Sequence, residues 1–233
     1  MAGIIVQLAI SWLIAWLIEK RNLSVLGLFP TKPRLISFFI FFIITSICCA
    51  TGFLFKIYLD NQKWVINPNL SVKLILSGTW WNIKSVLFEE LIFRGILLFI
   101  LIKHLGPIKA IVISAIAFGI YHWFSFGVIG NAIPMLVTFL TTGIMGLLLA
   151  YGYYKTFSLY IPIAIHLGWN FTQIFVFSQG PIGNGLFVPV NGAPFRTDSY
   201  IIFFCVTFLP MLLALSINFI LLKRLNSPKT MRL

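Results

Sequence analysis

Three charged side chains lie within six residues of one apolar segment, at Glu89, Glu90 and Arg94. An ionised side chain at the centre of a bilayer costs about 2.5–3.5 kcal/mol on insertion scales, so such residues face protein or water and find partners. In a helix, Glu90 and Arg94 share a face, whereas Glu89 is turned by about 100° from Glu90. We therefore expect Glu90 and Arg94 to form a structural ion pair, with Glu89 as a reactive base. The alternative is that all three charges only hold the helices together.

Two of the three histidines lie in other apolar segments. His122 comes four residues after Phe118, and His166 comes four residues before Asn170, so each pair shares a helix face. The third, His104, follows a lysine at the end of an apolar segment and is expected to be interfacial rather than catalytic. One buried histidine is usually a hydrogen-bonded core residue. Two histidines in separate helices, with a glutamate pair in a third, predict a shared cavity.

A glutamate and two histidines in one cavity are compatible with two kinds of hydrolysis. Glu89 could activate a water as a general base, while nearby donors stabilise the oxyanion that forms on a peptide carbonyl. Glu89, His122 and His166 are also a catalytic zinc set, with water as the fourth ligand. The residue types alone leave both open.

The composition predicts that the helices positioning these residues lie in a membrane. The chain has 233 residues, of which 60% are hydrophobic and 9% charged, and its mean hydropathy is +1.00. Soluble domains carry about 25% charged residues, and the chain is too apolar to be disordered. Long continuous apolar segments argue against a β-barrel. We expect an all-α, polytopic transmembrane helical bundle with its site in an intramembrane cavity.

The net charge and the cysteine content do not point to further binding partners. The net charge of +12 does not indicate nucleic-acid binding, because the Lys and Arg residues lie at the ends of apolar segments. The expected partner is the lipid bilayer. The three cysteines form no C-x-x-C pair and are expected to be free thiols. Glu19, Asp60 and Asp198 lie between apolar segments and receive no role.

Hydropathy divides the chain into about seven predicted spans, roughly 4–18, 35–57, 83–102, 108–126, 133–153, 158–178 and 200–222. Residues 70–82 extend the third span, lie at the interface, or form a re-entrant turn near Gly78. An eighth helix there would reverse the orientation of the spans before it. We expect the Gly- and Pro-rich residues 179–199 to be an external connection rather than a cover over a site. Residues 1–233 are expected to form a single integral membrane domain, with the motif-bearing core at about 80–178.

Three motifs, in order and in separate apolar segments, resemble those of the CPBP family. This family comprises intramembrane endopeptidases, including type II CAAX prenyl endopeptidases and bacteriocin-processing or immunity proteins. The motifs are E-E-x-x-x-R (Glu89, Glu90, Arg94), F-x-x-x-H (Phe118, His122) and H-x-x-x-N (His166, Asn170). No motif position departs from the family pattern, and the flanking spans are similar to the family only in hydropathy.

The resemblance implies four catalytic residues. Glu89 would polarise the attacking water with help from His122. His166 and Asn170 would hold the developing oxyanion. The chemistry agrees with what peptide hydrolysis needs, a base beside a water and donors aimed at the tetrahedral oxygen.

The resemblance also implies three supporting residues and no metal. Glu90 and Arg94 would support the first glutamate, and Phe118 would pack in the pocket. The family is similar to glutamic peptidases, so we expect no cofactor, and zinc at Glu89, His122 and His166 is the minority alternative.

The function that follows is hydrolysis of a peptide bond in a small membrane-associated protein or peptide. Frequent Ile, Phe, Lys and Asn are typical of a low-GC bacterium, so we expect a multi-pass protein of a bacterial plasma membrane. Its role would then be peptide or bacteriocin processing, or self-immunity. One alternative is a non-catalytic immunity or regulatory scaffold of the same fold. A small transporter is a weaker alternative, because no repeated pair of broken spans is evident.

Overall fold

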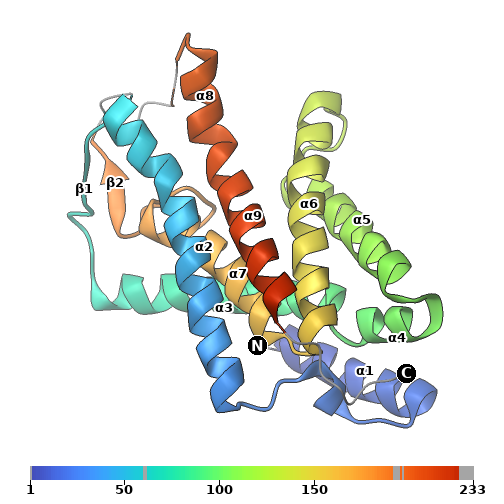
Figure 1. Cartoon of the computed structure of the whole chain (residues 1–233). Coiled ribbons are helices and arrows are strands. Elements are labelled where there is room, and N and C mark those ends of the chain that lie inside the picture. Colours follow the sequence, from blue (N-terminus) through green and yellow to red (C-terminus); the bar gives the residue numbers. More distant parts are fainter. Residues whose placement is uncertain (1, 60–61, 191–194, 196, 226–233) are drawn as a thin grey trace. The chain divides into compact units, whose positions relative to one another are not determined.

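A computed structural model describes residues 2–59, 62–190, 195 and 197–225 of the chain (Figure 1). The helices, in chain order, are α1 (Ala2–Glu19), α2 (Lys32–Leu59), α3 (Val72–Phe93), α4 (Ile96–Leu105), α5 (Pro107–Ser125), α6 (Ala132–Thr156), α7 (Tyr160–Asn170), α8 (Tyr200–Thr207) and α9 (Leu209–Arg224). A 3₁₀ turn (Leu23–Leu26) follows α1, and a π-helical turn (Phe171–Val176) continues α7. Two three-residue strands, β1 (Trp64–Ile66) and β2 (Phe187–Pro189), pair antiparallel. The predicted all-α membrane fold is confirmed.

Fewer helices can cross a membrane than hydropathy predicted. By length and composition, α1, α2, α5 and α6 qualify among the described residues. The pair α8 and α9, bent by 44°, gives a fifth if it forms one span. The sixth predicted span, 158–178, is instead the short helix α7 followed by the π-helical turn.

The predicted third span at 83–102 is wrong. Helix α3 ends at Phe93 and α4 begins at Ile96. The reason lies at Gly95, where a Cβ atom would come within 2.1 Å of the Leu91 carbonyl oxygen, so the chain turns at a residue without a side chain. Because α3 begins at Val72, residues 72–82 belong to the same helix as Glu89, and extension of that helix was one of the predicted alternatives.

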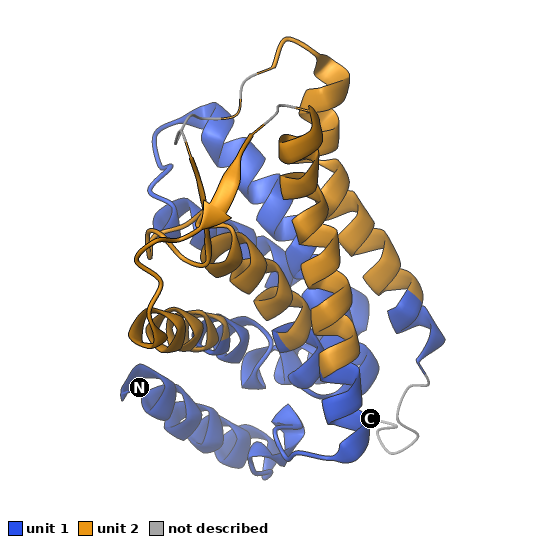
Figure 2. Cartoon of the chain, turned by 90° about the vertical axis from the view of Figure 1, so that its left-hand side faces the viewer, with its two compact units in different colours: residues 1–38, 87–163, 221–233 blue, residues 39–86, 164–220 orange. Residues whose placement is uncertain are grey.

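The chain forms two compact units, each assembled from separate stretches of sequence (Figure 2). Unit 1 comprises residues 1–38, 87–163 and 221–233, and unit 2 comprises residues 39–86 and 164–220. The prediction of a single membrane domain stays a prediction.

In unit 1, α5 and α6 pack closely through small residues. A Cβ atom on Gly119 would lie 2.8 Å from the Phe139 ring, and one on Gly146 would lie 3.2 Å from the Cα of Ala115. In membrane proteins the hydrophobic effect does not drive helices together, because lipid tails are as apolar as the side chains. Helices associate instead through close packing, and small residues allow their backbones to approach each other. This contact fixes the spacing of the helix that carries His122.

The end of α1 is fixed to the end of α4 by an acid that sequence analysis left without a role. The Glu19 side chain is 1% exposed and forms a salt bridge with Lys103. Its other oxygen lies 2.9 Å from Nε2 of His104. Glu19 is therefore a structural residue rather than a loop acid, and His104 is its partner. Asp60 lies outside the described residues.

In unit 2, α7 packs against α2 at very short range. A Cβ atom on Gly168 would lie 2.6 Å from the Phe42 carbonyl oxygen, and Ser46 Oγ donates to the Gly168 carbonyl at 3.2 Å. The buried Asn218 of α9 donates to Thr45 Oγ1 at 3.0 Å. The contacts at Gly168 hold α7, which carries His166, and the Asn218 bond joins α9 to α2.

The small sheet orders part of the predicted connection 179–199. Trp64 pairs with Pro189 and Ile66 pairs with Phe187. The rings of Phe53 and Phe177 stack beside the sheet with centroids 4.0 Å apart. Within the described part of this segment, the chain is thus tied back to the end of α2 and to β1.

Candidate active site

The end of α3 holds a fully buried ion pair. Arg94 Nη1 lies 3.1 Å from Glu90 Oε1, and both side chains are 0% exposed. The spacing of four residues predicted this pair, and the structure confirms it. Removal of either side chain would leave the other charge buried without compensation, which is strongly destabilising.

The Arg94 guanidinium also joins α3 to α5 and α6. Its Nη2 donates to the Gly146 carbonyl at 3.4 Å. Its central carbon lies 3.9 Å from the centroid of the Phe118 ring. A planar guanidinium satisfies both contacts at once, by donating in its plane and stacking through its face. Arg94 is thus a junction between the end of α3, α5 and α6 in unit 1.

His122 is oriented by its own helix toward Glu89. Its Nδ1 lies 2.8 Å from the Phe118 carbonyl oxygen. Because a carbonyl only accepts, Nδ1 carries a proton and donates it. The other ring nitrogen, Nε2, then faces Oε2 of Glu89 at 3.7 Å, with side-chain exposures of 7% and 9%. Both atoms are near enough to contact the same water molecule.

Phe118 connects the ion pair to the histidine. Its ring stacks under Arg94 on one side and meets the His122 ring edge to face, with centroids 4.4 Å apart. Its exposed fraction is 2%. The prediction gave Phe118 a packing role, and the structure adds its carbonyl as the acceptor that orients His122.

In unit 2, the H-x-x-x-N motif forms a hydrogen bond at the end of α7. Asn170 Nδ2 lies 3.1 Å from His166 Nε2. With the amide in this orientation, Nε2 accepts and the proton of a neutral ring is on Nδ1. Asn170 is the last residue of α7, directly before the π-helical turn. Such turns are rare and occur often at functional sites.

The structure therefore brings the predicted residues together in two sets. Glu89, Glu90, Arg94, Phe118 and His122 lie together in unit 1. His166 and Asn170 lie together in unit 2. Their convergence on one cavity stays a prediction.

No group of three His, Cys, Asp or Glu side chains is placed to hold a metal ion in the part of the chain that the structure describes. Glu89 and His122 in unit 1 are two side chains of the types that zinc binds.

Three residues near the motifs were missed by sequence reasoning. Ser114 Oγ donates to the Phe93 carbonyl at 2.8 Å and so satisfies a backbone group where α3 ends. Gly95 permits the turn that follows. Asn82, fully buried in α3, donates to the Gly78 carbonyl at 2.9 Å. An asparagine in an apolar helix was a signal that hydropathy counting overlooks.

The fold and the site define a helical membrane protein with a buried glutamate–histidine pair beside a buried ion pair. Residues 71–172 match the model of the family described as type II CAAX prenyl endopeptidase, Rce1-like. The matched segment contains all three motifs, so the resemblance to the CPBP family is confirmed over it. No curated protein and no solved structure matches the chain. The family points to a CAAX-protease-like intramembrane endopeptidase.

Proposed function

We propose that this protein hydrolyses peptide bonds in the membrane with a glutamate as general base. The observation that carries the proposal is the 3.7 Å separation of Glu89 Oε2 and His122 Nε2, both on buried side chains. Two hydrogen-bond acceptors this close are suited to holding the two hydrogens of one water. The lone pairs of that water would then face a peptide carbonyl.

The reaction balances without another reactant. Glu89 removes a proton from the water as its oxygen bonds to the carbonyl carbon. The carbonyl oxygen becomes an oxyanion, which His166 and Asn170 stabilise as donors. As the tetrahedral intermediate collapses, the C–N bond breaks and Glu89 returns the proton to the leaving amine. This requires that the His166–Asn170 pair reach the same peptide bond as Glu89.

The supporting residues act through position. Glu90 and Arg94 fix the end of α3 one residue from Glu89. Phe118 holds the His122 ring in the tautomer whose Nε2 can accept. None of the three needs to touch the substrate.

We propose that the reaction proceeds without a metal. Metal analysis of purified protein, paired with a chelator control, tests this. Substoichiometric zinc and full activity after chelation support it. Stoichiometric zinc, lost together with activity, would overturn it in favour of zinc held by Glu89, His122 and His166.

The proposed substrate is a small membrane-associated protein or peptide in a bacterial plasma membrane, cleaved during peptide or bacteriocin processing or self-immunity. The family's description supports a membrane-associated substrate, and the residue usage of the chain supports a bacterial source.

The test is peptidomics of cells that express the wild type, Glu89→Gln or a control. Asp198→Asn is a matched control, because it also replaces an acid by its amide, at an exposed position. We expect product peptides with the wild type and with Asp198→Asn, and their loss with Glu89→Gln at equal expression. Immunity that survives Glu89→Gln unchanged would instead favour the scaffold. Solute flux in proteoliposomes would favour a transporter.

A further inference from the structure

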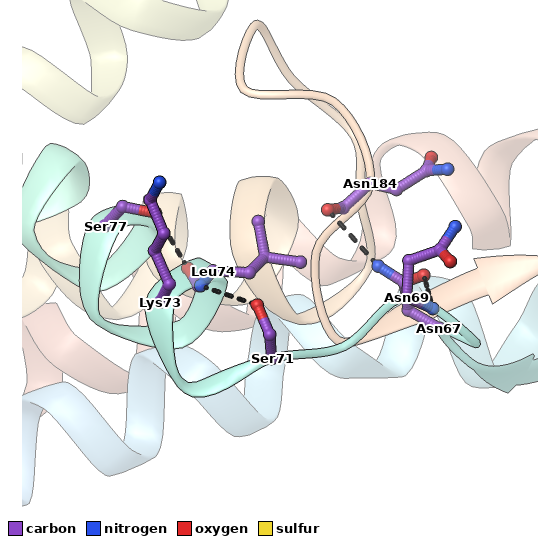
Figure 3. A pocket seen from close by; sticks show the side chains of 7 residues that line it. All are labelled: Asn67, Asn69, Ser71, Lys73, Leu74, Ser77 and Asn184. Carbon is purple, nitrogen blue, oxygen red and sulfur yellow. Dashed lines mark hydrogen bonds between the residues drawn. The ribbon is translucent and has the colours of Figure 1, made fainter.

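Two adjoining surface cavities, both open to the outside, lie along the first half of α3, within unit 2. The first, of about 390 Å³, is lined mainly by polar side chains, namely Asn67, Asn69, Ser71, Lys73, Leu74, Ser77 and Asn184 (Figure 3). The second, of about 800 Å³, is lined mainly by apolar ones, namely Val72, Lys73, Leu76, Ser77, Thr79, Trp80 and Ile83. Lys73 and Ser77 line both, so a polar space passes into an apolar one at these two residues.

The polar cavity has a fixed wall and a single cation. The Asn67 side chain is 4% exposed, donates to the Gly185 carbonyl at 2.8 Å and accepts from the Asn69 amide at 2.9 Å. The bond to Gly185, together with one to the Asn184 carbonyl at 3.5 Å (Figure 3), ties the loop with Asn184 to the turn before α3. Lys73 is exposed and forms no salt bridge with any residue that the structure describes. The cavity therefore offers one uncompensated positive charge and several amides.

The apolar cavity follows a stripe on one face of α3. Val72, Leu76 and Trp80 succeed one another at intervals of four residues and are 72%, 65% and 45% exposed. Helix α3 is not among the described helices that length and composition identify as spans. A tryptophan beside such a stripe is typical of the membrane interface. The stripe is thus an apolar surface next to a cationic polar pocket.

We infer that α3 binds an anionic phospholipid. Its phosphate would lie in the polar cavity against Lys73 and Ser77, and one acyl chain would lie along Val72, Leu76 and Trp80. A free anion would leave the apolar stripe empty, and a purely apolar ligand would leave Lys73 unused. Only an amphiphile with a negative head uses both cavities. This inference does not rest on hydrolysis, and its test needs no substrate.

The experiment is native mass spectrometry of the purified full-length protein with equal amounts of phosphatidylglycerol and phosphatidylcholine of the same acyl chains. One Lys near an anionic lipid surface contributes an effect of about five-fold in affinity. We expect the wild type to retain phosphatidylglycerol about five-fold more than phosphatidylcholine. Lys73→Gln should abolish this preference. Lys84→Gln should keep it, because Lys84 lies on the same helix but lines neither cavity.

A second pair of measurements separates the lipid from its headgroup. Leu76→Asn should weaken the retention of both lipids. The lipid that this variant still retains should show the same preference for phosphatidylglycerol. Inorganic phosphate should not displace the lipid. The inference is overturned if Lys73→Gln keeps the preference, if Lys84→Gln abolishes it equally, or if phosphate alone competes as well as the lipid. Glu89→Gln should bind lipid like the wild type, so failure here and failure of the proposed hydrolysis are distinguishable.

Discussion

Nε2 of His122 faces Oε2 of Glu89 at 3.7 Å. The opposite nitrogen of the ring donates to a carbonyl one helical turn earlier, so the α5 backbone selects the nitrogen that faces the carboxylate. Helix α3 in turn places Glu89 one residue before a buried ion pair. The two neighbouring glutamates thus occupy different environments, so their replacement is predicted to affect stability differently.

Glu90→Gln should destabilise the protein far more than Glu89→Gln. The first variant leaves the Arg94 charge buried without its carboxylate, a loss of about 3–5 kcal/mol. The second replaces a carboxylate whose Oε2 lies 3.7 Å from Nε2 of His122. Thermal unfolding of both variants in one detergent measures the difference. Equal melting temperatures would contradict the separate roles.

Arg94→Lys should lower stability although the charge remains. An ammonium cannot stack on Phe118 through a planar face while it donates to Gly146, and the cation–π contact alone is worth about 2 kcal/mol when desolvated. Arg34→Lys is the control, because Arg34 is outside the site and its guanidinium donates to the Phe29 carbonyl at 2.7 Å. Chemical unfolding curves of the two variants should differ. A loss no greater for Arg94→Lys than for the control would contradict the junction role.

Gly146→Ala should perturb the site, whereas Gly143→Ala should not. At Gly146 a Cβ atom would lie 3.2 Å from the Phe118 ring and 3.3 Å from Arg94 Nη2, so these groups must move. At Gly143 the nearest atom is 3.8 Å away, an ordinary contact. We expect a loss of about 1–3 kcal/mol for the first and none for the second. Unfolding free energies in detergent check this, and equal effects would contradict it.

Glu19→Gln should loosen α1. The variant weakens the contacts to Lys103 and His104, whose side chains are 40% and 56% exposed, so solvent screening limits the loss to about 1 kcal/mol. Hydrogen exchange of α1 amides should rise while that of α6 stays unchanged. Unchanged exchange in α1 would show that apolar packing alone holds this helix.

Local relationships were predictable from the sequence, because helix geometry alone determines them. The Glu90–Arg94 pair followed from a spacing of four residues. The hydrogen bond between Asn170 and His166 has the same spacing. The membrane class followed from composition.

Relationships that depend on packing were not predictable. Hydropathy merged α3 and α4 into one span, since it cannot register that the chain turns at Gly95, where the backbone leaves no room for a Cβ atom. It also overlooked the partner of Glu19, which lies 84 residues along the chain at Lys103. The sheet of β1 and β2 joins strands too short to show a periodic pattern.

The most direct test of the central claim is the cleavage rate of Glu89→Gln in proteoliposomes, with a substrate found by peptidomics. A general base contributes about 10²–10⁴-fold to such a rate. The account predicts a loss in this range for a protein that melts like the wild type, with Asp198→Asn unaffected. A folded Glu89→Gln variant that cleaves at the wild-type rate would contradict it.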